Sequence, residues 1–166
     1  FAIIFYIIKT FRQKFGTITL EKIVWRKFMD NLIIRKYIND DFNVVIKLLK
    51  DNFNISDNIK SIDDNLNSFG IVAFLNKKIV GYIRIDKLNN PFKNSYYYFL
   101  SYVCVDSNYQ NAGIATKLLE FIFNMAKDDN ISYIELTSRS SREAANHLYL
   151  KNGFVIRDTN VFRKEM

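Results

Sequence analysis

The feature that most constrains the fold is a turn built on Gly113, one of only five glycines in the 166-residue chain. An apolar run over residues 100–105 comes just before it, and apolar residues with helical spacing follow over 114–127. This pattern predicts a strand, a short polar turn and then a helix. The first N–H groups of such a helix lack partners within it, and the helix dipole makes them electropositive. Residues 110–115 therefore suit an anion, although an ordinary strand-to-helix turn explains them equally well.

The remainder of the chain alternates between strand and helix patterns that short polar segments separate. We expect strands over residues 32–37, 71–75, 79–86, 96–105, 131–137, 153–157 and 160–164. We expect helices over residues 40–53, 57–68, 114–127 and 141–151. The polar turn at 76–78 makes a hairpin of the two strands beside it, and Pro91 lies in an expected loop. This order predicts an α/β fold, in which a mixed sheet carries flanking helices on its faces.

The first 28 residues differ in charge from the rest of the chain. They carry six basic side chains against Glu21 alone, a net +5, which leaves +2 of the chain's +7 for residues 29–166. Their opening apolar run is too short for a bilayer, which needs roughly 20 residues. We expect an extraneous or extra segment at 1–28, followed by the domain at 29–166. A membrane-surface helix and an integral extra helix are the alternatives for this segment.

Composition excludes several classes of site. The nearly neutral body of the chain argues against a nucleic-acid interface. Cys104 is the only cysteine, so no internal disulfide forms, and its apolar surroundings predict a small buried side chain. Together with His147, the only histidine, it cannot build the usual structural zinc site, and we expect no metal. The glycine patterns of dinucleotide-binding and nucleotide triphosphatase loops are also missing.

A second motif follows about 30 residues after the turn. Residues 144–149 have helical spacing and end in Tyr149, and Gly153 then ends the helix in the left-handed conformation that helix C-termini favour. Tyr149 can be a core aromatic like the other nine tyrosines, or its phenol can face a cleft beside the reactive end of a ligand. The residues alone leave both interpretations open.

The two motifs together resemble those of the GCN5-related N-acetyltransferase (GNAT) family. Residues 105–115, VDSNYQNAGIA, match the family's V-x-x-x-x-Q/R-x-x-G-x-G/A, and residues 145–154, ANHLYLKNGF, match A-x-x-L/F-Y-x-x-x-G-F. The expected element order over 32–164 matches as well. Two features depart from the usual pattern: the pair Asn111-Ala112 stands where many members have glycine, and Arg142 stands where the family often has Asn.

The resemblance implies that the cofactor is acetyl-CoA. Its pyrophosphate would lie on the amides of 110–115, and its pantetheine arm would pair with the backbone of 103–105, in a gap beside strand 131–137. The implied cofactor-binding residues are Val103, Cys104, Val105, Gln110, Asn111, Ala112, Gly113, Ile114, Ala115, Thr116, Arg142 and Asn146. Arg142 is equally well interpreted as a residue that caps and solvates its helix.

The resemblance also implies that an amine attacks the thioester directly. Tyr149 can protonate the departing thiolate, because a phenol has an ordinary pKa of about 10 and a thiol one of about 8.5. The alternative is that Tyr149 only orders a water or packs on the thioester. Glu135 is the candidate base, with Asp106 as a second candidate, and Glu135 can equally be a solvated strand residue. His147 is expected at the surface.

The sequence therefore predicts a cytoplasmic, acetyl-CoA-dependent N-acetyltransferase that modifies a primary amine of a small molecule or peptide. The alternative is a catalytically inactive member of the same fold that binds acyl-CoA or a protein. We expect no nucleic-acid partner, and we expect membrane contact only through residues 1–28. A homodimer is possible. The acceptor is expected against helices 40–53 and 57–68 and the loop at 88–96.

Overall fold

The computed structural model describes residues 29–166, which form two compact units that divide between Leu136 and Thr137. The expectation for residues 1–28 falls outside the described residues, and the boundary at residue 29 stays a prediction.

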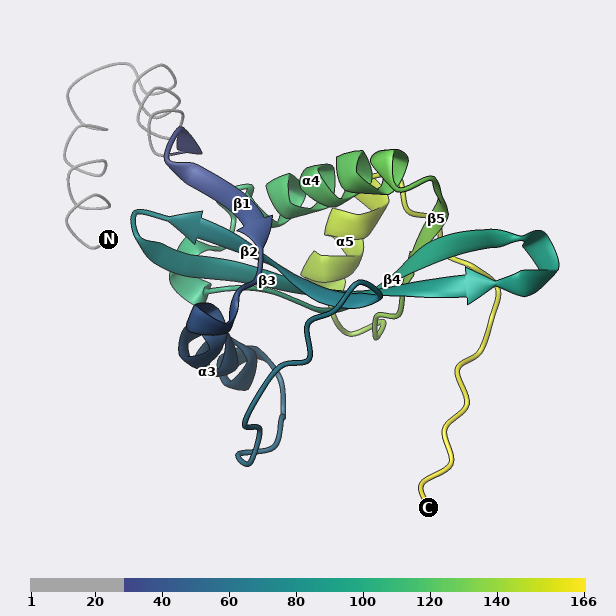
Figure 1. Ribbon diagram of the computed structural model, residues 1–166, viewed down its shortest axis with the longest axis horizontal. Coiled ribbons are helices and arrows are strands. Elements are labelled where there is room, and N and C mark those ends of the chain that lie inside the picture. Colours follow the sequence, from purple (N-terminus) through teal and green to yellow (C-terminus); the bar gives the residue numbers. More distant parts are fainter. Residues whose placement is uncertain (1–28) are drawn as a thin grey trace. The chain divides into compact units, whose positions relative to one another are not determined.

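The first unit is built on a five-stranded mixed sheet (Figure 1). Its strands are β1 Leu32–Lys36, β2 Ser68–Leu75, β3 Lys78–Asn90, β4 Ser95–Val105 and β5 Ile131–Leu136, and they lie side by side in that order. Neighbouring strands are antiparallel except β4 and β5, which are parallel. The predicted mixed α/β sheet is therefore confirmed.

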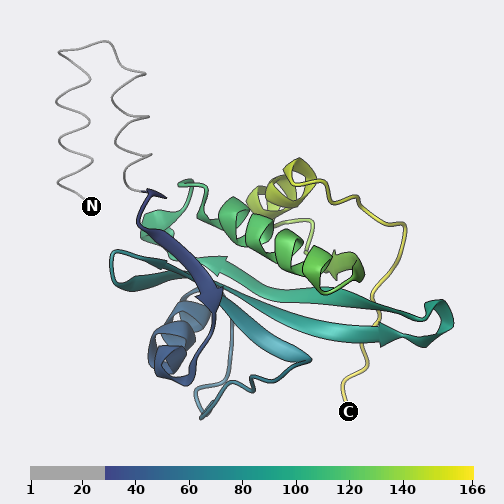
Figure 2. The same ribbon diagram turned by 45° about the horizontal axis from the view of Figure 1, so that its top comes forward.

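Two helices cover opposite faces of this sheet (Figure 2). The first, α3 Phe42–Asn52, buries Val45, Leu48 and Leu49 in a cluster with Tyr82 of β3. The second, α4 Ile114–Asp128, packs on the other face and buries five apolar residues: Ile114, Leu118, Leu119, Ile122 and Ala126. Both helices were predicted, because their apolar residues recur at the helical period and find a sheet to cover.

The prediction of a loop at 88–96 is wrong, because the β3–β4 hairpin continues through these residues. Strand β3 runs to Asn90, a 3-10 turn follows at Pro91–Lys93, and β4 begins at Ser95. Pro91 starts the turn, and Asn94 closes it with φ 44°, a conformation that asparagine tolerates. The pairing of Leu88 with Tyr97 extends the ladder into the predicted loop. The pair is an apolar and aromatic contact, which stabilises adjacent strands.

The helix expected at 57–68 is also wrong. This segment holds turns instead, and its polar side chains take the backbone bonds that a helix would use. The Asn65 Oδ1 accepts the N–H groups of Asn67 at 2.9 Å and Ser68 at 3.0 Å, and Ser56 Oγ accepts that of Asn58 at 3.2 Å. The side chains of Asn, Asp and Ser bond to the nearby backbone in this way, which makes these residues unfavourable inside helices.

The second unit, residues 137–166, contains helix α5 Glu143–Lys151 and an extended tail. The helix confirms the prediction over 141–151, and Gly153 takes φ 86° just after it. The strands expected at 153–157 and 160–164 are wrong. Four apolar tail residues are 77–90% exposed: Val155, Ile156, Val161 and Phe162. An alternating pattern makes a strand only against a partner, and this unit contains no strand to pair with.

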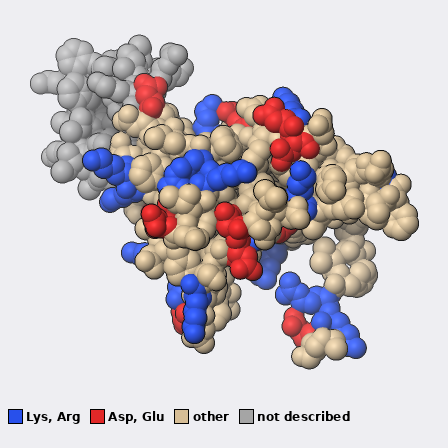
Figure 3. Space-filling view, in the orientation of Figure 1, with Lys and Arg blue, Asp and Glu red and all other residues tan. Residues whose placement is uncertain are grey.

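The described surface mixes both signs of charge. Figure 3 shows lysine and arginine interspersed with acidic side chains on the face it draws, as expected from the near-neutral charge of residues 29–166. No helix within 29–166 combines the length and apolar character needed to cross a membrane.

Candidate functional site

The site predicted from the turn begins at a bulge in β4. Tyr82 of β3 lies opposite Cys104, but Arg84 lies opposite Ser101, so β4 holds one extra residue between these pairs. Tyr102 takes φ 51° there, in the left-handed region. A non-glycine residue in that region costs about 1–3 kcal/mol, and such strain gathers at functional sites. A bulge redirects the backbone beyond it.

Beyond the bulge, β4 presents an open backbone edge. Its pairing with β5 ends at Leu100 and Leu136, and no other strand of residues 29–136 pairs with that edge. The N–H of Asp106 bonds to the Val80 carbonyl of β3 at 2.9 Å. Because backbone direction alternates along an antiparallel strand, Cys104 also faces β3.

The same alternation turns the Val103 carbonyl and the Val105 N–H toward the open edge. One acceptor and one donor, two residues apart, are the groups to which an extended amide chain bonds as an added strand. The family resemblance implies the pantetheine arm on this edge. Cys104, whose backbone faces β3, is only 5% exposed, which confirms its prediction as a small buried side chain.

Two side chains fix the start of the loop after β4. The Asp106 carboxylate accepts the Asn108 N–H at 2.8 Å and the Asn108 Nδ2 at 3.0 Å, and it thereby caps the 3-10 turn Ser107–Tyr109. Gln110 Nε2 donates to the Val105 carbonyl at 3.2 Å. Asp106, the second candidate base, therefore already has a structural task. Gln110 ties the loop to the strand edge beside it.

The loop then crosses to α4 through two left-handed residues. Asn111 has φ 60° and Gly113 has φ 81°. Asparagine is the non-glycine residue that adopts this conformation most readily, so Asn111 serves where many family members have glycine. A Cβ at Gly113 would meet no atom within 4 Å. The side of the loop that carries Gly113 is therefore open.

The N-terminus of α4 has the features of an anion site. Gly113 is its N-cap and supplies no side-chain cap, and the first turn contains no acidic residue. The N–H groups of Ile114, Ala115 and Thr116 lie in that turn, where a helix provides no internal acceptor. The helix dipole adds partial positive charge at the same place. Ala112 and Ala115 are half-buried and small, and Ile114 anchors the turn because it is fully buried.

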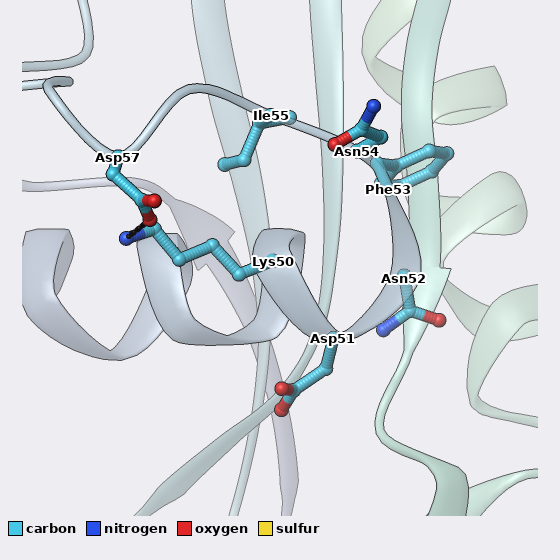
Figure 4. Close-up of a pocket in the computed structure, with 7 residues that line it drawn as sticks. All are labelled: Lys50, Asp51, Asn52, Phe53, Asn54, Ile55 and Asp57. Carbon is cyan, nitrogen blue, oxygen red and sulfur yellow. Dashed lines mark hydrogen bonds and ion pairs between the residues drawn. The ribbon is translucent and has the colours of Figure 1, made fainter.

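An open surface pocket of about 470 Å³, here called the cavity, lies at the end of α3 and the loop that follows it (Figure 4). Its lining is Lys50, Asp51, Asn52, Phe53, Asn54, Ile55 and Asp57. Lys50 Nζ pairs with Asp57 Oδ1 at 2.6 Å and bridges the helix to the loop. The Phe53 ring meets the Tyr102 ring edge-on, with centroids 5.4 Å apart. The cavity is thereby linked to the β4 bulge. No sequence motif marks Phe53 or Tyr102, so neither was predicted as a site residue.

Glu135, the other candidate base, lies in the middle of β5. It is half-buried and stands opposite Phe99 of β4. Two residues earlier on the same face, Tyr133 stacks on Tyr97 with centroids 4.7 Å apart. The predicted strand is therefore confirmed, and Tyr133 and Glu135 lie on the same face of it. The role of Glu135 as a base stays a prediction.

The remaining predicted residues lie in the second unit. Tyr149 of α5 is 8% exposed, and its ring packs against Phe154 with centroids 5.7 Å apart. Asn146 Nδ2 donates to the carbonyls of Arg139 at 3.0 Å and Ser140 at 3.3 Å, which holds the turn before the helix. Arg142 is the N-cap of α5, and its side chain makes no capping bond. The roles of Tyr149, Asn146 and Arg142 stay predictions. His147 is exposed, as expected.

Comparisons with known proteins agree with this geometry. No curated protein sequence matches the chain. Many solved structures share its fold. An aminoglycoside acetyltransferase from an uncultured soil metagenomic sample, solved with sisomicin, has 20% identity and a TM-score of 0.71, covering 82% of this chain and 97% of its own. A ribosomal-protein-alanine N-acetyltransferase of Brucella melitensis has 16% identity and a TM-score of 0.71, covering 81% and 99%.

A third structure is that of a predicted acetyltransferase of Clostridium acetobutylicum with acetyl-CoA, at 22% identity and a TM-score of 0.64, covering 80% of this chain and 96% of its own. At these identities the likenesses show the fold alone. The profile of the acetyltransferase (GNAT) family matches residues 33–154, which span β1, both helices of the first unit, the loop at 110–115 and α5. The chain belongs to the acetyltransferase (GNAT) family.

Proposed function

We propose that this protein is an acetyl-CoA-dependent N-acetyltransferase that moves an acetyl group to a primary amine of a small molecule or peptide by direct attack. The observation that carries the proposal is the pairing of an uncapped α4 N-terminus with an open β4 edge beside it. One suits a pyrophosphate and the other suits an extended amide chain. The cytoplasmic location expected from the sequence is part of this proposal.

The loop residues fit a bulky, doubly charged anion. Gly113 and Asn111 turn the backbone so that the helix N-terminus stays uncovered, and Thr116 adds a hydroxyl in the first turn. Ala112 and Ala115 keep side chains short where a phosphate would approach. The amides of 110–115 would then hold the pyrophosphate, while the Val103 carbonyl and the Val105 N–H would bond to the pantetheine amides.

The bound cofactor supplies a thioester that an amine can attack. A backbone N–H near the β4 bulge would hold the carbonyl oxygen as it gains negative charge. The Tyr149 phenol would give its proton to the departing sulfur. Glu135 would accept the proton of the attacking amine through water, since its half-buried carboxylate lies on the strand next to β4.

The acceptor would bind at the cavity beside Phe53. The lining includes the Phe53 ring and the Asp51 carboxylate, both of which attract a cationic amine, whereas Asp57 is already paired with Lys50. Family relatives in the same fold include enzymes for an aminoglycoside and for a ribosomal-protein alanine. A screen of acceptors should therefore include sisomicin and short peptides with free N-termini.

The proposal is tested by titrating acetyl-CoA into the full chain by calorimetry. We expect saturable binding to the wild type and none to Gly113→Glu, because that substitution places bulk and negative charge on the anion site. Gly153→Glu is the matched control, since Gly153 has a similar φ of 86° and equally open surroundings. Loss of binding in Gly113→Glu alone supports the site. A folded wild type that binds no acetyl-CoA overturns the proposal. Binding without turnover on any amine favours an inactive acyl-CoA-binding member.

A further inference from the structure

Tyr102 has an unusual backbone conformation for its place in the chain. Six non-glycine residues of the described chain have positive φ: Asn76, Lys77, Asn94, Tyr102, Asn111 and Asn130. The others lie in turns or connecting segments, and all but Lys77 among them are asparagines. Tyr102 is the only one within a strand, and the residue is 47% exposed. Neither its residue type nor deep burial accounts for the left-handed conformation.

The Tyr102 ring contacts Phe53. The two rings meet at 84° with centroids 5.4 Å apart. Phe53 is itself held in place, because its N–H bonds to the Leu49 carbonyl at 2.8 Å and its side chain packs on the core beneath α3. A side chain anchored in this way can hold a neighbour in a strained conformation.

This ring contact joins the two halves of the proposed site. Phe53 lines the cavity at the end of α3, and Tyr102 directly precedes Val103, whose carbonyl faces the open β4 edge. A molecule in the cavity that moves Phe53 would therefore change the restraint on the bulge. A cofactor on the β4 edge would in turn act on Phe53, because coupling between two binding sites is reciprocal.

We propose that Phe53 is a positioning residue that holds the β4 bulge through Tyr102 and so couples the acceptor cavity to the cofactor edge. The inference rests on the proposed function for its meaning, since it names the link between the two ligands of that site. Its structural part concerns the free protein and is measured without any ligand.

Hydrogen exchange of the Cys104 amide in the full chain reports on the bulge, because this N–H faces β3 and lies two residues after Tyr102. We expect Phe53→Leu, which keeps an apolar side chain but removes the ring, to raise its exchange rate about tenfold. The amides of Leu100 and Ile85 should change less than twofold. Tyr96→Ala is the matched control, since Tyr96 is 48% exposed on the same strand outside the bulge.

Tyr102→Gly supplies the second arm, because glycine takes positive φ without strain. In that background Phe53→Leu should change Cys104 exchange less than twofold, since no restraint is left to lose. An unchanged Cys104 rate in Phe53→Leu overturns the proposal. So does an equal rise at Leu100 and Ile85, which would make Phe53 a general packing residue.

Calorimetry on the same variants tests the coupling. Phe53→Leu should weaken acetyl-CoA binding about five- to tenfold, and Tyr96→Ala should leave it unchanged. Unchanged affinity in Phe53→Leu overturns the coupling. A wild type that binds no acetyl-CoA defeats the proposed function instead, and the exchange experiment then still decides whether Phe53 holds the bulge.

Discussion

At Gly113 the backbone conformation, and not a lack of space, restricts which residue types the position accepts. A Cβ would meet nothing within 4 Å, yet φ is 81°. We expect Gly113→Ala to lower the free energy of unfolding by about 1 kcal/mol and Gly113→Asn by less than half of that, since asparagine tolerates the left-handed region. Urea denaturation of the full chain measures both. Equal losses would mean that φ is not the restriction.

Asp41 is a buried carboxylate that ties β1 to the start of α3. It accepts two bonds from Arg35, at 2.6 and 2.8 Å, and one from the Ile38 N–H at 3.0 Å. Burial would raise the pKa of Asp41, but these bonds and the charge of Arg35 outweigh burial and hold the pKa below its ordinary value. The ionised carboxylate therefore stabilises the fold.

We expect Asp41→Asn to lower the free energy of unfolding by about 2 kcal/mol at pH 7, because a hydrogen-bonded charged group is lost while Arg35 stays one-third exposed to solvent. Since the folded pKa is depressed, the stabilisation is complete above the ordinary pKa of about 4 and is lost as the pH falls through the lower folded value. Urea denaturation should show the full difference in free energy of unfolding between wild type and variant at pH 7 and at pH 5, and a smaller difference at pH 3. Asp40→Asn, at the exposed neighbour, should show little difference at any of them.

Tyr149 carries the proposed acid role through its hydroxyl alone. Tyr149→Phe keeps the ring that packs on Phe154, so the fold and acetyl-CoA binding should be preserved. Turnover should fall about 100-fold, the usual scale of a lost general acid. Steady-state rates with the first acceptor found would measure it, with His147→Ala on the exposed side of α5 as the control. Equal turnover in Tyr149→Phe would remove the acid role.

The residues of the site differ in how far the sequence predicts them. Gly113 and the polar residues before it predict a turn, because few residue types adopt the conformations that a turn requires. Tyr102 gives no such signal, since a tyrosine within an aromatic run predicts ordinary strand. Its bulge follows from the register that β3 imposes on β4, which is tertiary information.

At the scale of elements, the predictions succeeded where an apolar face had a partner. Helices α3 and α4 each show the helical period and each cover one face of the sheet. The segment 57–68 has polar residues that bond to their own backbone, so its weak periodicity did not make a helix. The alternating pattern at 153–164 had no neighbouring strand within its unit. Periodicity describes what an element can cover, and the partner is supplied by the rest of the fold.

The Asn65 side chain organises the last turn of the segment before β2. Asn65 accepts two N–H groups with its side chain, and its own N–H bonds to the Ser68 carbonyl at 2.8 Å. Asn65→Ala should lower the free energy of unfolding by about 1 kcal/mol, because both N–H groups lose their acceptor. Asn58→Ala, in the same segment, is the control, since only the backbone of Asn58 is bonded there. Equal losses in urea denaturation would show that Asn65 does not organise the segment.

At the scale of the whole molecule, a ligand that binds the folded chain must also stabilise it. At 100 times its dissociation constant, acetyl-CoA should add about 2.7 kcal/mol to the free energy of unfolding. For a chain of this size that corresponds to a rise in Tm of roughly 5–10 °C. Gly113→Glu should show no rise, while Gly153→Glu should behave as the wild type does.

The ligand series then separates the two parts of the proposed cofactor site. Coenzyme A without the acetyl group keeps the pyrophosphate and the pantetheine amides, so it should raise the Tm of the full chain nearly as much as acetyl-CoA. Adenosine has neither, and at the same concentration it should raise the Tm by less than a quarter as much, because nothing would lie on the α4 N-terminus or the β4 edge. Thermal denaturation with each compound makes the measurement. If adenosine matched acetyl-CoA, recognition would lie outside both, and the turn at Gly113 would be a structural turn only.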